Sequence, residues 1–308
     1  PDNEVIRNDM LDYAIEVEHF DNHLGKALAL LEASGQLDNT LIVATSDHGM
    51  PFPRAKGQAY DHSNHIPLAI RWASGIKGAG RVVEDFVDFA DLAPTFLEAG
   101  CVANAGPIMQ PISGRSLFPV FNAQETDKRD LHRDHVLVGK ERHDIGRPNN
   151  WGYPIRGIVK GDMLYLYNFK TDRWPAGHPL TGYLNCDGSP TKSLILEMRR
   201  NRSNNDFWDL CFGRRPTDEL YDLSSDPDCV KNLAGHGMHA DVIAAMKKQL
   251  FSELKTQGDP RMSGLGDVFD SYPYSGASTD NFYDRFVSGE KVKAGWVNLS
   301  DFEKDPVE

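Results

Sequence analysis

Apolar residues recur at helical spacing along the first part of the chain. Between Arg7 and Gly35 they follow the 3.6-residue period of an amphipathic helix, and Gly35 is a residue type that favours a helix end. The pattern predicts one long helix over residues 7–35. Its apolar positions are Leu11, Ala14, Ile15, Val17, Phe20, Leu24, Ala27, Leu28 and Leu31.

Two short apolar segments follow the predicted helix. The first, TLIVATS (residues 40–46), is β-branched and apolar on both faces, which predicts a central strand of a parallel sheet covered by helices. The second, IPLAIRW (residues 66–72), predicts another strand, and residues 82–100 predict a short strand and a helix that ends at Gly100. Strands that alternate with helices are typical of a layered α/β sheet, in which ligands gather at the carboxyl ends of strands.

The pattern changes beyond about residue 118. Short strand-like segments lie at residues 134–143, 154–169 and 218–223, and an amphipathic helix lies at residues 239–258. They predict a small antiparallel sheet with a packed helix. The remaining residues are rich in Ser, Gly, Asp and Tyr and predict an extended tail. We expect an α/β domain, a C-terminal subdomain and a tail over residues 1–118, 119–258 and 259–308.

Composition is that of a globular protein. The chain has 308 residues, of which 40% are hydrophobic and 25% charged, so it has enough material for a sizeable core. Its net charge of −12 argues against a nucleic-acid or anionic-membrane partner, because either requires a basic surface. No apolar run approaches the ~20 residues needed to span a bilayer. The polar start, PDNEVIRND, leaves two alternatives, a cytoplasmic protein or one whose N-terminus has been removed.

An acid, an imidazole and two cations lie close together after the first predicted strand. Asp47 and His48 offer a carboxylate and an imidazole to a divalent cation, although Asp47 also suits a simple turn with Gly49. Arg54 and Lys56 follow in the proline-stiffened loop PFPRAKG. Next to a metal, a fixed lysine stabilises negative charge that develops on an ester in its transition state. The alternative is that both cations point into water.

A second charged cluster, GKERHD, covers residues 139–144. It predicts either a specificity pocket for a charged polar substrate or a solvated loop. Aromatic residues nearby suit stacking on sugar rings or, more commonly, a core: Trp151, Tyr153 and Trp174. The four cysteines form no close pair, so the sequence allows both disulfides and reduced thiols: Cys101, Cys186, Cys211 and Cys229.

Three stretches resemble sulfatases. The run DYAIEVEHFDNHLGKALALLEASGQLDNTLIVATSDHG is similar to the sulfatase segment that carries the second pair of metal ligands. The run DHGMPFPRAKGQAYDHSNHIPLAIRW resembles the heparan N-sulfatase (sulfamidase) branch in its PFP after DHG. The run ELYDLSSDPDCVKNLAG resembles the C-terminal signature, in which the chain enters the last strand and helix. Together the resemblance covers about residues 7–72 and 134–260.

This resemblance implies an alkaline-phosphatase-like α/β/α sandwich with a small C-terminal subdomain. It makes Asp47 and His48 the second metal-ligand pair, and Lys56 the cation that contacts the sulfate and the leaving group. The metal implied is calcium, with magnesium or manganese as alternatives. Family members usually have Asn at the position of His48, and this departure bears on the metal because calcium prefers oxygen ligands.

The resemblance also implies parts that this chain lacks. Sulfatases use a formylglycine nucleophile made from the Cys or Ser of a C/S-x-P/A-x-R motif in the N-terminal half, and none precedes Pro1. Cys211 has an Arg at the right distance in CFGRR, but Gly213 stands where Pro or Ala is required, so we expect a structural thiol. We therefore expect a C-terminal portion, either a fragment, a processed product or the partner of a separate N-terminal chain or an oligomer, without turnover on its own.

The activity implied is hydrolysis of a sulfuric ester or sulfamate in a glycosaminoglycan-like saccharide, in the periplasm, outside the cell or in a lysosome. Two alternatives stay open, a phosphoryl hydrolase of the same superfamily and a noncatalytic saccharide-binding module. An upstream Thr or Ser nucleophile would favour phosphate. The residues expected to contact the saccharide, with the last two as weaker candidates, are Lys56, Arg54, Asn64, His65, Glu141, Arg142, His143, His62 and Asp61.

Overall fold

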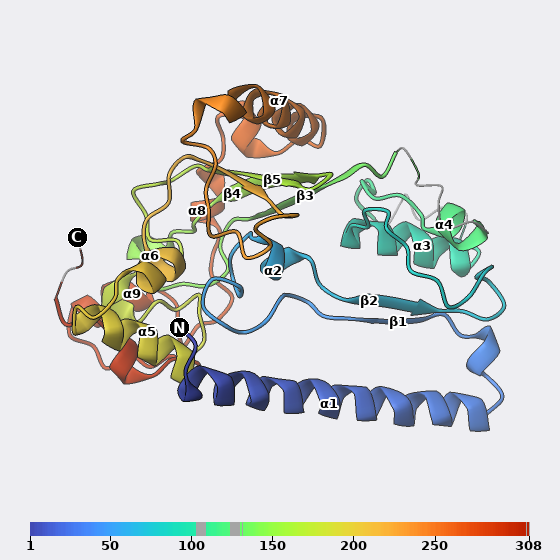
Figure 1. The fold of residues 1–308 in the computed structure, drawn as a ribbon, viewed down its shortest axis with the longest axis horizontal. Helices are drawn as coiled ribbons and strands as arrows, with labels where there is room; N and C mark the ends of the chain where they lie inside the picture. The colour runs from blue at the N-terminus through green and yellow to red at the C-terminus, as the bar shows by residue number, and fades with distance from the viewer. Residues whose placement is uncertain (103–108, 124–129, 131, 306, 308) are drawn as a thin grey trace. The chain divides into compact units, whose positions relative to one another are not determined.

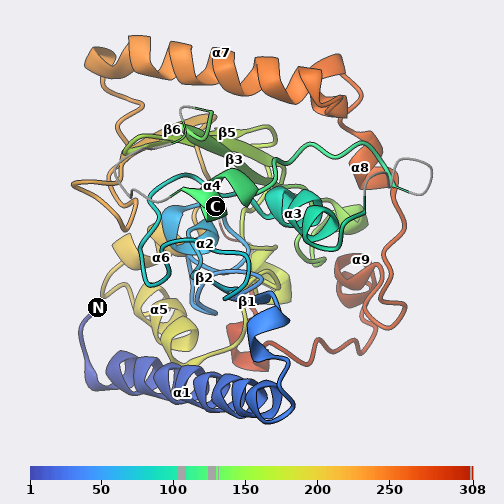
Figure 2. The ribbon, with the colours of Figure 1, turned by 90° about the vertical axis from the view of Figure 1, so that its right-hand side faces the viewer.

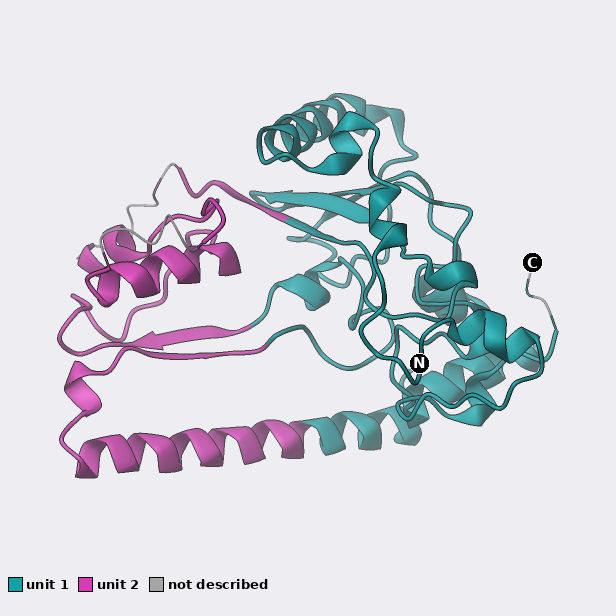
Figure 3. Ribbon diagram, turned by 180° about the vertical axis from the view of Figure 1, so that it is seen from behind, with its two compact units in different colours: residues 1–13, 47–66, 138–308 teal, residues 14–46, 67–137 magenta. Residues whose placement is uncertain are grey.

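The computed structural model describes the chain except residues 103–108, 124–129, 131, 306 and 308 (Figure 1). Its residues divide into two compact units, coloured in Figure 3. Unit 1 contains residues 1–13, 47–66 and 138–308, and unit 2 contains residues 14–46 and 67–137. Both units are discontinuous in sequence, and the division at residues 118 and 258 stays a prediction. No helix in the described part of the chain is both long and apolar enough to cross a membrane.

The long N-terminal helix is confirmed. Helix α1 spans Glu4–Ala33, and Asn3 caps its start by accepting a hydrogen bond of 3.1 Å from the Ile6 amide. No side chain of α1 is buried. Leu11 and Ile15 are each about three-fifths exposed, so the apolar face that the sequence predicts is not buried.

The strands of unit 2 pair differently from the sequence prediction. After the 3-10 turn η1 (Leu37–Asn39), β1 (Ile42–Thr45) pairs with β2 (Leu68–Arg71) in an antiparallel register that sets Val43 opposite Ile70. The expected parallel pairing of the first strand is therefore wrong among the described residues. An apolar strand predicts burial on both faces but leaves the direction of its neighbour open.

The helices that follow β2 in unit 2 begin at a capping box. Asp88 and Asp91 bond each other's backbone amides and start η2 (Phe89–Asp91), which leads into α3 (Leu92–Ala99). The helix before Gly100 is confirmed, whereas the short strand expected before it does not form. Buried Asp91 also pairs with Arg133 at 2.5 Å. The short helix α4 covers Phe118–Asn122.

The antiparallel sheet and its helix are confirmed. The strand order is β3-β4-β5-β6, and β5 pairs antiparallel with both β4 and β6. Helix α7 runs along one face of the sheet (Figure 2) and buries Met246, Leu250 and Leu254. The elements are β3 (His135–Lys140), β4 (Ile155–Lys160), β5 (Met163–Asn168), β6 (Asp218–Asp222) and α7 (Ala240–Thr256).

Two helices of unit 1 were not predicted. Helix α5 (Pro190–Arg200) starts at Ser189, whose side chain accepts a hydrogen bond from the Lys192 amide, and α6 (Asp206–Phe212) follows. The Ser-Pro pair was a readable start signal. The helices enclose a core of aromatic residues and cysteines, with Trp208 donating to the Tyr183 hydroxyl at 3.0 Å. Trp174 belongs to this core, and Tyr153 to the core under the sheet, as the sequence favoured.

Short helical segments complete unit 1 and give the tail more structure than expected. Phe282 in the tail is fully buried, in a core that also contains Ile145 and Leu184. The segments are α2 (Asp61–Asn64), η3 (Pro148–Asn150), η4 (Pro179–Thr181), η5 (Gly237–His239), η6 (Pro260–Ser263), α8 (Val268–Ser271), α9 (Phe282–Val287) and η7 (Leu299–Asp301).

Candidate active site

Asp47 and His48 lie side by side just beyond β1. The Asp47 side chain is 87% exposed, and its Oδ1 lies 3.7 Å from Nε2 of His48. The other ring nitrogen, Nδ1, lies 2.7 Å from the Gly49 carbonyl oxygen. A carbonyl only accepts, so Nδ1 carries the hydrogen, and in the neutral ring the lone pair is on Nε2. The pair therefore presents a carboxylate and an imidazole nitrogen in the form that a metal ion binds.

The other predicted residues of this loop contact their neighbours in the chain or the distant Asp228. Helix α2 carries Asp61, His62 and Asn64, and the Gly49 amide bonds to its Ser63 carbonyl at 3.2 Å. Asn64 donates to the Tyr60 carbonyl at 3.1 Å. His62 lies 2.8 Å from Asp228, and His65, with an 80% exposed side chain, lies 3.4 Å from Asp61.

Arg54 anchors the loop. Its φ is 72°, a left-handed conformation that is uncommon outside glycine. The guanidinium donates to the carbonyl oxygens of Leu210 at 2.5 Å, of Asp228 at 3.4 Å and of Cys229, and it lies 3.9 Å from the centre of the Tyr60 ring. These contacts give Arg54 a structural role, and its predicted role in substrate binding stays a prediction.

Lys56 forms an ion pair that the sequence did not reveal. Its Nζ lies 2.6 Å from Oδ2 of Asp187, and the side chains are 20% and 30% exposed. Close by, a Cβ on Gly57 would lie only 2.7 Å from the His143 ring. Asp187 is distant in the sequence and stands in no local motif, so only the fold shows that it neighbours Lys56.

Burial moves the pKa values of His143 and Asp144 in opposite directions. Desolvation, followed by the positive charges of Lys140 and Lys56, lowers the pKa of His143 to about 4. Desolvation also raises the pKa of Asp144 to about 6, against the opposing hydrogen bond from the Ile145 amide. Both shifts arise because burial disfavours the charged form. His143 is therefore a neutral hydrogen-bonding group at neutral pH.

Lys140, the last residue of β3, contacts the loop that carries Lys56. Its Nζ donates to the carbonyl oxygens of Gly57 and, at 3.1 Å, of Pro175. Burial, and then the positive charges of Arg147 and Arg215, hold the pKa of Lys140 well below its usual value. The side chain thus fixes the residue that follows Lys56.

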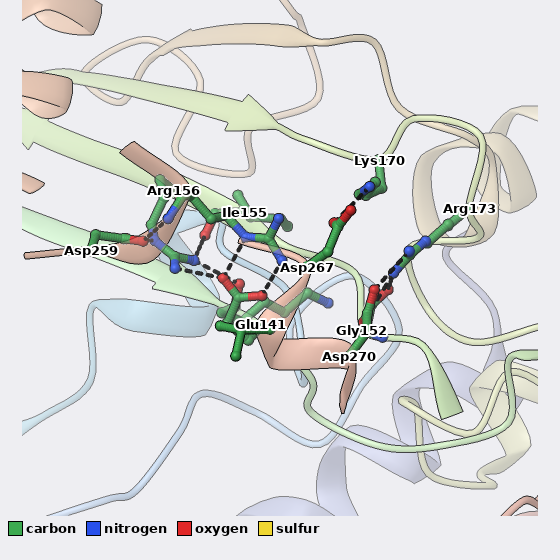
Figure 4. Close-up of polar contacts among 12 residues, drawn as sticks. Glu141, Gly152, Ile155, Arg156, Lys170, Arg173, Asp259, Asp267 and Asp270 are labelled. Carbon is green, nitrogen blue, oxygen red and sulfur yellow. Dashed lines mark hydrogen bonds and ion pairs between the residues drawn. The ribbon is translucent and has the colours of Figure 1, made fainter. Parts of the chain in front are cut away.

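Glu141 and Arg142 face the C-terminal segment. Arg156 reaches Glu141 at 2.5 Å, and Arg261 reaches it at 2.6 Å (Figure 4). Arg142 donates to the Tyr272 carbonyl at 2.9 Å. Of the predicted saccharide contacts in this run, only His143 lies with Lys56.

The predicted metal ligands, Asp47 and His48, stay a prediction. Over the residues that the structure describes, no group of three His, Cys, Asp or Glu side chains is arranged to hold a metal ion. Asp47 and His48 fit as two ligands of a larger set, because one is a hard carboxylate and the other an imidazole with its tautomer set. Cys211 is not a nucleophile of the expected kind: it is buried, and burial raises its pKa to about 11. All four cysteines are free thiols.

Comparison with known proteins shows similarity to sulfatases. The sulfatase family model matches residues 2–100. An ulvan-active sulfatase of Formosa agariphila is 26% identical over 267 residues, which are 84% of this chain and 40% of that protein. N-sulphoglucosamine sulphohydrolase of Homo sapiens is 26% identical over 257 residues, which are 81% of this chain and 48% of that protein. The chain thus spans less than half the length of these curated relatives.

A solved structure shows the fold. The YidJ protein of Bacteroides fragilis matches with a TM-score of 0.58 at 18% identity, over 86% of this chain and 47% of that one. At this identity the likeness concerns the fold alone, and it confirms the expected alkaline-phosphatase-like α/β architecture. The family match and these relatives also confirm the resemblance read from the motifs. The chain is thus similar to sulfatases, through the family model over residues 2–100 and through relatives matched over most of its length.

Proposed function

We propose that this chain is the C-terminal portion of a sulfuric ester or sulfamate hydrolase that acts on sulfated, glycosaminoglycan-like saccharides. The observation that carries the proposal is the convergence of Lys56, His143 and Asp187, which are far apart in the sequence but lie together in unit 1. A partly buried cation beside a neutral imidazole suits a sulfate group, which needs positive charge and hydrogen-bond donors. The names of the relatives, ulvan-active sulfatase and N-sulphoglucosamine sulphohydrolase, support a saccharide substrate.

In the proposed site, Lys56 binds a sulfate oxygen and Asp187 holds the ammonium group in place. His143 offers a hydrogen bond to the sugar or to the leaving group. Asp47 and His48 would hold a divalent cation, with calcium first and magnesium or manganese as alternatives. Such an ion supplies positive charge against the sulfate oxygens. The nucleophile, expected to be formylglycine, would come from a segment upstream or from a separate N-terminal chain.

The first test is an intact mass of the protein from its native source, with peptide mapping and a search for a chain that co-purifies. The proposal requires a longer or partnered species whose C-x-P-S-R peptide carries formylglycine. Turnover of a sulfated saccharide with ordinary kinetics by the 308-residue chain alone would contradict it.

The second test is Lys56→Met in that longer or partnered species. Loss of a fixed charge that stabilises the transition state typically lowers kcat by about 10²–10³. Lys248→Met is the matched control, because Lys248 is exposed on α7, outside the candidate site. Assay of a phosphate monoester in parallel separates sulfatase from phosphoryl hydrolase activity. An unchanged kcat in Lys56→Met would remove Lys56 from the site.

A further inference from the structure

Residues 259–274 contact the end of β3 and the loops beside it through a series of ion pairs. The carboxylates of the segment reach three different cations, and its one arginine reaches Glu141 (Figure 4). The pairs, each from 2.6 to 2.8 Å, are Asp259 with Arg156, Arg261 with Glu141, Asp267 with Lys170 and Asp270 with Arg173. Four pairs along so short a segment fix it at several points.

Glu141 is held by two guanidinium groups. Arg261 donates through Nε at 2.7 Å to one carboxylate oxygen and through a terminal nitrogen at 2.6 Å to the other. Arg156 adds a bond of 2.5 Å. Arg261 is only 4% exposed and Arg156 11%, so little water screens the pairs. Bidentate pairing of this kind fixes orientation as well as charge.

The same segment supports the backbone of Glu141. Asp270 accepts the Gly152 amide at 3.0 Å and pairs with Arg173 at 2.8 Å. Gly152 in turn packs against Glu141, since a Cβ there would lie 2.5 Å from the Glu141 carbonyl oxygen. Asp270 therefore acts on Glu141 through Gly152.

The same segment also contacts the residues that follow Glu141. Arg142 donates to the carbonyl oxygens of Tyr272 at 2.9 Å and Pro273 at 3.4 Å. Tyr274 lies 5.7 Å from the Arg142 guanidinium, and burial, followed by the charge of Asp144, raises the pKa of Tyr274. Residues 259–274 thus contact Glu141 and Arg142 and lie near Asp144, on both sides of His143 in the sequence.

We propose that residues 259–274 form a clasp that positions residues 141–144 and neutralises Glu141. A free carboxylate beside Arg142 would repel a sulfated ligand, whereas one paired with two arginines would not. Glu141, Arg261 and Asp270 are then positioning residues. That the ligand is a sulfated saccharide rests on the proposed function.

The test compares Arg261→Gln with Arg200→Gln in the 308-residue chain. Arg200→Gln is the control, because it breaks an ion pair with Glu303, a tail residue outside the clasp, and does not involve residues 141–144. Amide hydrogen exchange of residues 139–146 should rise at least tenfold in Arg261→Gln and stay unchanged in the control. Equal exchange in the two variants would overturn the clasp. If Arg261→Gln does not fold, Asp270→Asn gives the same comparison.

Binding of a disulfated heparin-derived disaccharide tests the charge. Arg261→Gln should weaken it at least fivefold, and adding Glu141→Gln should restore part of the loss, which a purely structural role of Arg261 would not allow. Absence of that recovery would overturn the neutralising role. If the unsubstituted chain does not bind the disaccharide but exchange responds as expected, the neutralising role is overturned and the positioning role stands.

Discussion

At the scale of single residues, the site shows how one physical cause produces opposite shifts. Desolvation lowers the pKa of His143 and raises the pKa of its neighbour Asp144, because both residues lose water around their charged forms. The sequence placed both in a charged run that is ordinarily solvated. Their environment, rather than their residue type, makes one neutral and the other weakly acidic.

Asp144→Asn should stabilise the chain above about pH 6 and leave its stability unchanged near pH 4. The folded pKa of about 6 lies above the ordinary 3.8, so the carboxylate costs stability as pH rises from about 4 to about 6, and the cost is constant above that range. The asparagine removes this cost, a gain of up to about 3 kcal/mol at pH 8 that disappears at pH 4. Urea unfolding at the two pH values measures it.

The control for this measurement is Asp162→Asn. Asp162 is exposed in the turn between β4 and β5, where a change of charge should alter stability by no more than about 0.5 kcal/mol at either pH. A gain in Asp144→Asn that is equal at pH 4 and pH 8 would show that the carboxylate is not desolvated in the folded chain.

At the scale of elements, α1 shows that a sequence pattern can predict a helix without showing what packs against its apolar face. The helix forms where the apolar spacing and Asn3 place it, yet none of its side chains is buried. A helix of this kind normally owes most of its stability to packing of its apolar face. The exposed face includes Phe20, at 54%, and Leu30, at 73%.

Ile15→Lys with Phe20→Lys should make the isolated chain less adhesive without destabilising it. Exposed apolar side chains bind hydrophobic dyes and promote self-association, and neither side chain is buried here. Dye fluorescence should fall severalfold, while the melting temperature stays within about 2 °C because surface changes cost little. Glu16→Gln with Glu18→Gln, on the same turns, raises the net charge by the same amount and controls for charge. A large drop in melting temperature would show that this face packs within the chain.

At the scale of the whole chain, the candidate metal site is incomplete. Asp47 and His48 offer two donors, and the described residues supply no third to make a group. Calcium sites use 6–8 oxygen ligands, so two donors give weak affinity. The chain also spans only 40% to 48% of two curated relatives, in keeping with donors contributed from elsewhere.

The isolated chain should therefore bind calcium with a Kd no tighter than about 1 mM, the weak end of protein calcium sites. Adding an upstream half should tighten binding at least a hundredfold, and Asp47→Asn should abolish most of that gain. Calorimetry measures both, with Asp241→Asn on α7 as a control for net charge. Micromolar affinity of the isolated chain would show that its own residues complete the site.

The sequence by itself determined the local elements and the chemistry at their ends. Periodicity located α1, both strands of unit 2, the antiparallel sheet and α7, because spacing and turn residues act over a few positions. The three sulfatase-like stretches together were sufficient to predict the resemblance that the comparisons support. Helix α5 was not predicted, although the Ser-Pro pair at its start is a signal that the sequence contains.

The tertiary structure alone decided which residues meet. The direction of the strands in unit 2 depends on how two separate segments pair. The ion pairs Lys56–Asp187 and Arg261–Glu141 likewise join residues that are distant in the sequence. Charge runs such as GKERHD look alike whether they are solvated or paired. Partner, burial and hence pKa are set by residues brought together only when the chain folds, and no local pattern encodes them.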